Sequence, residues 1–167
     1  MGFSVMTVCT GNICRSPMAE IVLRQRLAAA GLADQVVVDS SGVSDEEHGH
    51  PVDRRARAVL AAHGYPAGDG HRAHRITPGE LASRDLVLAM TSQHARALRR
   101  IAGDADHIVM YRRFDPAAPV VGPGEPEHVL DIDDPWYGDA EGFEDCLAQI
   151  EAAADGIVEH IRGRLGA

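Results

Sequence analysis

The sequence predicts an α/β fold in a single domain, a doubly wound sheet of four parallel strands with helices on both faces. Short β-branched and apolar runs alternate with segments of helical period, which is typical of parallel strands joined by right-handed crossovers. The chain has 167 residues, 45% of them hydrophobic, which is enough for one core. Because no linker or change in composition divides it, we expect one domain over residues 1–167.

The first half of the chain alternates twice between strand and helix. Strands are expected at residues 3–8 and 35–40, where β-branched and apolar side chains follow one another. A helix is expected over residues 17–30, because apolar residues recur there at helical spacing and Gly31 follows. The same pattern predicts a second helix over residues 53–63.

The second half continues this alternation. The sequence TPGEL, from residue 77, combines a capping threonine, a proline at the first helical position and a glutamate at the third, so it predicts a short helix. Strands are expected at residues 85–90 and 106–111, with a helix over 92–101 between them and a final helix over 141–165. In sheets of this kind, ligands bind beyond the carboxyl ends of the strands.

Charge and cysteine content exclude several classes of protein. The formal net charge of −9 argues against binding of nucleic acid or of an anionic membrane, since both require a basic face. The three cysteines are too few for a secreted disulfide scaffold and lack zinc-site spacing, so neither a metal nor another cofactor is expected. With no signal peptide and no apolar stretch of about 20 residues, we expect a cytoplasmic protein. Export without a signal peptide and the oligomeric state stay open, with a monomer expected.

The segment CTGNICRSP, residues 9–17, joins the first strand to the first helix. A loop of backbone N–H groups that ends at a helix N-terminus binds anions, because those donors lack other partners and the helix dipole favours negative charge. The same field favours the thiolate of Cys9, which is the nucleophilic form of cysteine. Arg15 can hold two oxygens of the anion. Ser16 and Pro17 suit the cap and the first position of the helix.

Two further loop residues suit the path of the backbone. Gly11 permits close approach and a positive φ, and the Asn12 side chain can hydrogen-bond across the loop. The alternative for Cys9 is a buried structural cysteine at the end of a strand, which is a common arrangement. The combination of Cys9 with Arg15, Ser16 and a strand–loop–helix context favours the nucleophile.

The segment CTGNICRSPMAE resembles the phosphate-binding loop of the low-molecular-weight protein tyrosine phosphatases, in which cysteine is followed by five residues, arginine and serine. That family carries its general acid on an Asp-Pro pair followed by aromatic residues and glycine, and Asp134 begins such a sequence, DPWYG. The resemblance covers essentially the whole chain. It implies hydrolysis of phosphotyrosine in protein substrates through a phosphocysteine on Cys9, with Asp134 protonating the leaving oxygen. Without the Asp-Pro pair, Asp131, Asp133 and Asp134 are equivalent candidates, and the stretch reads as an ordinary turn and helix cap.

The resemblance also implies roles for residues around the loop. Ser16 stabilises the thiolate as it leaves phosphorus, and Asn12 is tied to a serine and a histidine, which match Ser40 and His71 here. The residues expected to bind phosphate or to support the loop are Thr10, Gly11, Asn12, Ile13, Cys14, Ser16, Ser40 and His71.

We expect different roles for the other two cysteines, Cys14 and Cys146. Cys14 is close in sequence to Cys9, and the resemblance suggests that oxidation joins them in a disulfide that protects the nucleophile. Cys146 falls on the apolar face of the final helix with Ile150, so it is expected in the core.

Four residues are expected to form the walls of the substrate pocket: Ile13, Glu46, Trp136 and Tyr137. Trp136 and Tyr137 would flank a flat aromatic substrate, and the alternative for both is ordinary packing beneath a loop. Glu46 stands where many members of the family have an aromatic residue, and this acidic rim should disfavour acidic phosphopeptides. Thr91 stands where the family usually has aspartate, and we expect only a changed hydrogen bond.

Three other functions of proteins with related folds or binding sites would require different residues. Thiol-linked arsenate reductases need a further pair of cysteines, which the chain lacks. Protein-arginine phosphatases tend to have threonine where Ile13 stands, and an apolar side chain suits a phenyl ring better than a guanidinium, so Ile13 favours phosphotyrosine. A non-catalytic phosphotyrosine-binding module needs Arg15 and the loop amides, but it has no use for Cys9 or Asp134.

Overall fold

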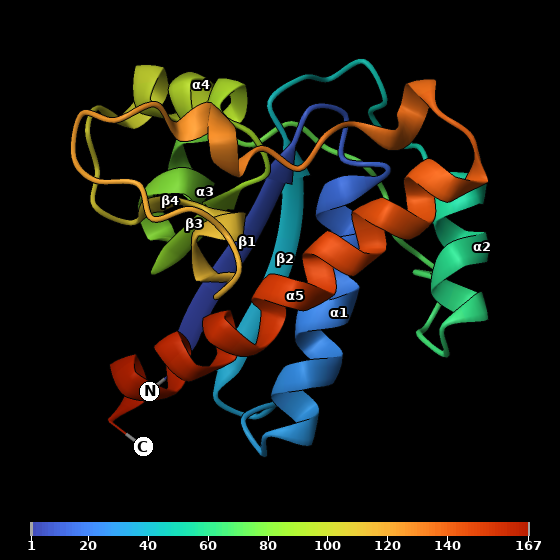
Figure 1. Ribbon diagram of the computed structural model, residues 1–167, viewed down its shortest axis with the longest axis horizontal. Coiled ribbons are helices and arrows are strands. Elements are labelled where there is room, and N and C mark those ends of the chain that lie inside the picture. The colour runs from blue at the N-terminus through green and yellow to red at the C-terminus, as the bar shows by residue number, and fades with distance from the viewer. Residues whose placement is uncertain (1, 167) are drawn as a thin grey trace.

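Four parallel strands form one sheet, as the sequence predicts. The computed structural model describes residues 2–166 (Figure 1). The strands lie in the order β2-β1-β3-β4, and each neighbouring pair is parallel. Their bounds are β1 (Phe3–Cys9), β2 (Val36–Gly42), β3 (Leu86–Ala89) and β4 (Ile108–Met110). All four carboxyl ends therefore meet at one edge of the sheet.

Helices cover both faces of the sheet, which confirms the predicted doubly wound architecture (Figure 1). The helices are α1 (Arg15–Ala29), α2 (Arg54–Ala62), α3 (Pro78–Ser83), α4 (Ser92–Ala102) and α5 (Ala140–Leu165). Helices α1, α2 and α5 pack on one face, and α3 and α4 on the other. Side chains alternate along β1, so Val5 faces the first layer whereas Met6 and Val8 face the second. Within residues 2–166, no helix combines the length and apolarity needed to cross a bilayer.

Several element boundaries differ from the prediction, among them the start of α1 and the end of β4. Helix α1 begins at Arg15, so Ser16 lies inside its first turn and is not its cap. The cap position belongs to Cys14, whose side chain makes no capping hydrogen bond. Strand β4 ends at Met110, because the chain turns there into a 3₁₀ helix (Tyr111–Phe114). The fully buried Tyr111 donates its hydroxyl to the carbonyl oxygen of Ile150 in α5 at 2.9 Å, which draws the chain beneath that helix.

Helix α5 packs tightly against this 3₁₀ helix at Gly156. A Cβ at this position would overlap the carbonyl group of Phe114. Gly156→Ala is therefore expected to lower the free energy of unfolding by about 1–3 kcal/mol, because a close-packed contact has no room for a methyl group. Gly163 lies in the same helix with open space around it, so Gly163→Ala should raise the free energy of unfolding by about 0.5–1 kcal/mol. Urea denaturation followed by circular dichroism measures both, and equal effects of the two substitutions would contradict this packing.

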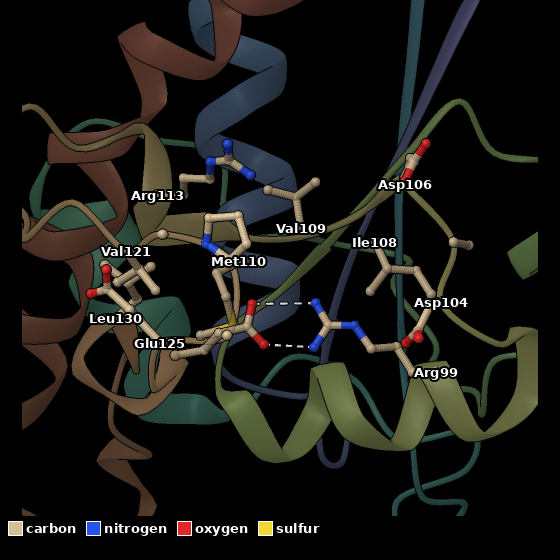
Figure 2. Close-up of a pocket in the computed structure, with 15 residues that line it drawn as sticks. Arg99, Asp104, Asp106, Ile108, Val109, Met110, Arg113, Val121, Glu125 and Leu130 are labelled. Atoms are coloured by element: carbon tan, nitrogen blue, oxygen red, sulfur yellow. Dashed lines mark hydrogen bonds and ion pairs between the residues drawn. The ribbon is translucent and has the colours of Figure 1, made fainter.

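Two cavities differ in how many of the predicted site residues line them. One, of about 550 Å³, lies between α4, β4 and the loop over residues 121–125 (Figure 2). Arg99 of α4 crosses its floor and donates to Glu127, with 3.2 Å between Nη2 and Oε2. The residues that line it include none of the predicted site residues. A smaller cavity, of about 150 Å³, contains most of them.

Candidate active site

The smaller cavity lies where β1 ends and α1 begins, and three parts of the chain line it. These are the loop over residues 9–15, residues 46–47 after β2, and residues 134–137 before α5. The last of these segments passes over the carboxyl end of the sheet, where the Ile132 N–H donates to the carbonyl oxygen of Met90 at 2.9 Å (Figure 1). The predicted catalytic residues Cys9, Arg15 and Asp134 all line this one cavity.

Cys9 and Ser16 are in direct contact inside the protein. The Cys9 Sγ lies 3.0 Å from the Ser16 Oγ, and both residues are buried. Ser16 Oγ accepts from Asn12 Nδ2 at 2.9 Å and donates to the carbonyl oxygen of Ser41 at 3.2 Å. Because a hydroxyl has one proton, Ser16 can bond either that carbonyl or the sulfur, and a thiolate is the stronger acceptor. Although Ser16 is not the helix cap, it makes the contact that its predicted role with the thiolate requires.

Asn12 shapes the loop through its backbone conformation and its hydrogen bonds. The prediction of a positive φ at Gly11 is wrong, because Asn12 takes it, with φ 61°. Asparagine tolerates this region when its short side chain is hydrogen-bonded locally. The predicted contacts are present: Asn12 Nδ2 donates to Ser40 Oγ at 3.0 Å, and the His71 Nε2 donates to the Asn12 carbonyl oxygen at 2.7 Å. The backbone N–H of His74 adds a third, to Asn12 Oδ1 at 3.1 Å.

The loop rests on the end of β2 at Gly42, which the sequence analysis missed. A Cβ at Gly42 would overlap the carbonyl oxygen of Thr10 and would lie 3.1 Å from the backbone nitrogen of Asn12. Only glycine therefore allows the loop to lie this close to the sheet. The residue escaped notice because the second strand was expected to end at Ser40.

Arg15 is buried, at 4% exposure, with one edge of its guanidinium still available. Its Nη1 donates to the carbonyl oxygen of Ile132 at 3.0 Å. Its Nη2 lies 3.5 Å from Asp134 Oδ2, and its Nε has no hydrogen-bond partner within the part of the chain that is described. A buried N–H without a partner costs free energy, so the Nε–Nη2 edge is suited to a planar, two-point contact with an anion.

Asp134 combines a structural contact with a place in the cavity. Its Oδ1 accepts the Trp136 N–H at 3.0 Å and so caps the 3₁₀ helix Pro135–Tyr137, while Oδ2 faces Arg15. Asp134 therefore caps a helix, as the alternative interpretation of this stretch expects, and lines the cavity as well. Of the other two candidate aspartates, Asp131 accepts the Ser92 N–H at the start of α4 at 2.7 Å, and Asp133 is exposed. Asp134 is the one of the three that lines the cavity.

The four predicted wall residues, Ile13, Glu46, Trp136 and Tyr137, all line the cavity. Trp136 is 42% exposed and Tyr137 89% exposed, so neither is ordinary packing beneath a loop. Arg55 of α2, which the sequence analysis missed, holds Trp136 in place. Its Cζ lies 4.8 Å from the Trp136 ring centroid, and its Nη1 donates to the Trp136 carbonyl oxygen at 3.1 Å. The missed residue Glu47 adds a second carboxylate to the rim.

His94 is a further residue that the sequence analysis missed. Thr91, which stands where the family usually has aspartate, caps α4 and forms a capping box with His94. This capping box is the changed hydrogen bond that the sequence analysis expects at Thr91. Burial, followed by the positive charge of Arg15, lowers the pKa of His94 to about 3, so its ring is neutral. Its Nε2 lies 2.8 Å from Thr10 Oγ1, beside the nucleophile. A histidine three residues after a capping threonine is the signal that could have indicated this contact.

The three cysteines are free thiols with different surroundings. Burial, and next the charge of Asp53, raises the pKa of Cys14 well above its usual range. Burial also raises the pKa of Cys146 to about 12, and this residue packs in the core with Ile150 as predicted. A disulfide between Cys9 and Cys14 stays a prediction.

Comparisons with known proteins agree with the geometry of this cavity. The profile of the family described as low molecular weight phosphotyrosine protein phosphatase matches residues 4–165. A low molecular weight protein-tyrosine-phosphatase of Streptomyces coelicolor is 44% identical over 165 residues, which cover 97% of this chain and 95% of that protein. The low molecular weight protein-tyrosine phosphatase A of Mycobacterium bovis is also 44% identical, over 96% of this chain and 93% of that protein.

Solved structures show the same fold. The crystal structure of YfkJ from Bacillus subtilis has a TM-score of 0.86 at 28% identity, covering 98% of this chain and 97% of that chain. A mutant of the YwlE arginine phosphatase has a TM-score of 0.80 at 23% identity over 96% of both chains, a likeness that concerns the fold alone. The family profile and the relatives at 44% identity both span nearly the whole chain. This chain therefore belongs to the low molecular weight phosphotyrosine protein phosphatases.

Proposed function

We propose that this protein hydrolyses phosphotyrosine in protein substrates through a phosphocysteine intermediate on Cys9. The observation that carries the proposal is that Cys9, Arg15 and Asp134, which come from opposite ends of the chain, line one cavity at the carboxyl ends of the strands. A nucleophile, an anion-binding group and an acid at one site are the components that phosphoryl transfer requires.

In the first step, the Cys9 thiolate attacks phosphorus and the bond from phosphorus to the tyrosine oxygen breaks. The loop amides and the Nε–Nη2 edge of Arg15 hold the equatorial oxygens of the phosphoryl group. Asp134, in its acid form, gives its proton to the leaving oxygen, so the product departs as neutral tyrosine. The Ser16 hydroxyl, 3.0 Å from Sγ, stabilises the sulfur while it is anionic.

In the second step, a water molecule attacks the phosphorus of phosphocysteine. The Asp134 carboxylate left by the first step accepts a proton from that water, and the S–P bond breaks. Phosphate is released and the thiolate is restored, with Ser16 again able to donate to it. Asp134 serves both steps because its Oδ2 faces the cavity while Oδ1 stays bound to the Trp136 N–H.

The walls of the cavity favour an aromatic substrate. Ile13, Trp136 and Tyr137 provide an apolar and aromatic lining that suits a phenyl ring. The alternative, hydrolysis of phosphoarginine, would place a planar cation against Ile13, which offers it no hydrogen bond. Glu46 and Glu47 at the rim disfavour acidic residues beside the phosphotyrosine.

The proposal is tested with two peptides of the same flanking sequence, one carrying phosphotyrosine and the other phosphoarginine. We expect kcat/KM to be higher for phosphotyrosine by about 100-fold or more, because Ile13 packs against a phenyl ring but offers a guanidinium no hydrogen bond. Release of phosphate measures both reactions. A preference for phosphoarginine would favour an arginine phosphatase, and tight binding of the phosphotyrosine peptide without turnover would favour a binding module.

A further inference from the structure

His94 is held in one tautomer beside the loop. The residue is buried, at 3% exposure, in the first turn of α4. The backbone N–H of Thr91 donates to its Nδ1 at 3.1 Å. Because a backbone N–H can only donate, Nδ1 carries no proton, and in a neutral ring the proton is on Nε2. That nitrogen lies 2.8 Å from Thr10 Oγ1, so His94 donates and the Thr10 hydroxyl accepts.

The same contacts fix the position of the ring. The Thr91 hydroxyl accepts the backbone N–H of His94 at 3.3 Å, so both the main chain and the ring of His94 are tied to the cap of α4. Burial and the nearby charge of Arg15 lower the pKa of His94 to about 3, which keeps the ring neutral and Nδ1 free to accept around pH 7. The Nε2–H group of His94 therefore faces Thr10 in a fixed position and keeps its proton around pH 7.

The hydrogen bonds of Thr10 leave its own proton without an acceptor. One lone pair of Oγ1 accepts from His94 Nε2, and the other faces Arg15 Nη2 at 3.5 Å. Within residues 2–166, no group accepts the hydroxyl proton of Thr10. Thr10 follows Cys9 in sequence and lines the same cavity. Because both lone pairs face His94 and Arg15, the O–H bond is free to point into the cavity, where a phosphoryl group would present acceptor oxygens.

We propose that the Thr10 hydroxyl is a further hydrogen-bond donor to the phosphoryl group, and that His94 is the positioning residue that aims it. The inference rests on the proposed function and deepens it, because it adds a side-chain donor to the loop amides and Arg15. The contact of Arg15 Nη2 with Thr10 Oγ1 is long, at 3.5 Å, so Nη2 remains available to the anion.

Substitution of Thr10 tests the donor. Thr10→Val removes the hydroxyl with little change in shape, and it is expected to lower kcat/KM for p-nitrophenyl phosphate by about 10- to 100-fold, the range for a hydrogen bond to a charged group. The inhibition constant of inorganic phosphate should rise in parallel, because phosphate accepts the same bond. Thr10→Ser restores the hydroxyl and should recover most of the loss. An unchanged inhibition constant in Thr10→Val would overturn the proposal.

Two substitutions of His94 by residues with amide side chains distinguish its positioning of Thr10 from its structural role in the cap of α4. In His94→Asn the amide oxygen can replace Nδ1 and keep the bond to Thr91, but no donor reaches Thr10. In His94→Gln the longer amide can place an N–H where Nε2 stood. We expect His94→Asn to lose as much activity as Thr10→Val and His94→Gln to recover most of it, with thermal unfolding confirming that both variants fold. The reverse order would show that the cap of α4 is what matters.

The double variant Thr10→Val/His94→Asn should be no less active than Thr10→Val, because His94 acts through that hydroxyl. If the activity losses of the two single variants multiply in the double variant, the proposal is wrong. Calorimetric binding of inorganic phosphate to Cys9→Ser, with and without Thr10→Val, tests the donor without turnover. If the wild-type protein does not hydrolyse phosphotyrosine, the proposed function fails; if Thr10→Val does not weaken phosphate binding to Cys9→Ser, only this inference fails.

Discussion

Cys9→Ser is expected to abolish hydrolysis of phosphotyrosine while leaving phosphate binding intact. A serine hydroxyl is not ionised at neutral pH and cannot take the place of a thiolate, so kcat should fall by about 10⁵-fold or more, as when other enzymes lose a nucleophile. The Arg15 edge and the loop amides that hold the anion are unchanged by the substitution. Single-turnover release of phosphate measures the reaction, and calorimetry with inorganic phosphate measures the binding.

Cys146 provides the matched control for this substitution. It is a buried thiol in the core that does not line the cavity, so Cys146→Ala should alter stability but keep kcat within a few-fold of the wild type. Mass spectrometry of wild-type enzyme quenched during turnover should find phosphorus on Cys9. Substantial activity in Cys9→Ser, or phosphorus on another residue, would refute the mechanism.

Asp134→Asn should slow the enzyme in a way that depends on the leaving group. Asparagine can still accept the Trp136 N–H and cap the 3₁₀ helix, but it cannot supply a proton. For phenyl phosphate, whose oxygen leaves as a basic phenolate, kcat/KM should fall by about 10²- to 10⁴-fold. For 2,4-dinitrophenyl phosphate, whose leaving oxygen needs no proton, the change in kcat/KM should be small.

The neighbouring Asp133 gives a control of the same chemistry. It is exposed and does not line the cavity, so Asp133→Asn should leave kcat/KM for both substrates close to the wild-type values. Steady-state kinetics with the two phosphate esters measure all three proteins. Equal losses of Asp134→Asn on both esters would assign Asp134 to binding and not to proton transfer.

Much of the fold could be predicted because local sequence and tertiary structure agree. The capping threonine, proline and glutamate of TPGEL give the capping box that starts α3, and the alternation along β1 matches the two layers it separates. The end of β4 depends on a distant contact. Tyr111, just after β4, donates to the carbonyl oxygen of Ile150, which lies 39 positions further along the chain, and no local pattern carries that information.

The site was predictable where it is continuous in sequence. Cys9 and Arg15 lie in one loop, and the Asp-Pro pair distinguishes Asp134 from its neighbours. Gly42 and His94 were missed because each is ordinary in its own segment and becomes significant only when the fold brings it under or beside the loop. Asn12 holds its positive φ through hydrogen bonds to Ser40 in β2 and to His71 and His74 in one distant loop, which no local pattern reveals.

The bond between Arg15 and the Ile132 carbonyl, together with the place of Asp134, has a consequence for biosynthesis. The phosphate loop is translated well before its acid and before the carbonyl that orients its arginine, because Ile132 lies 117 positions after Arg15. A nascent chain can thus build β1, β2 and β3 and still lack a complete catalytic centre.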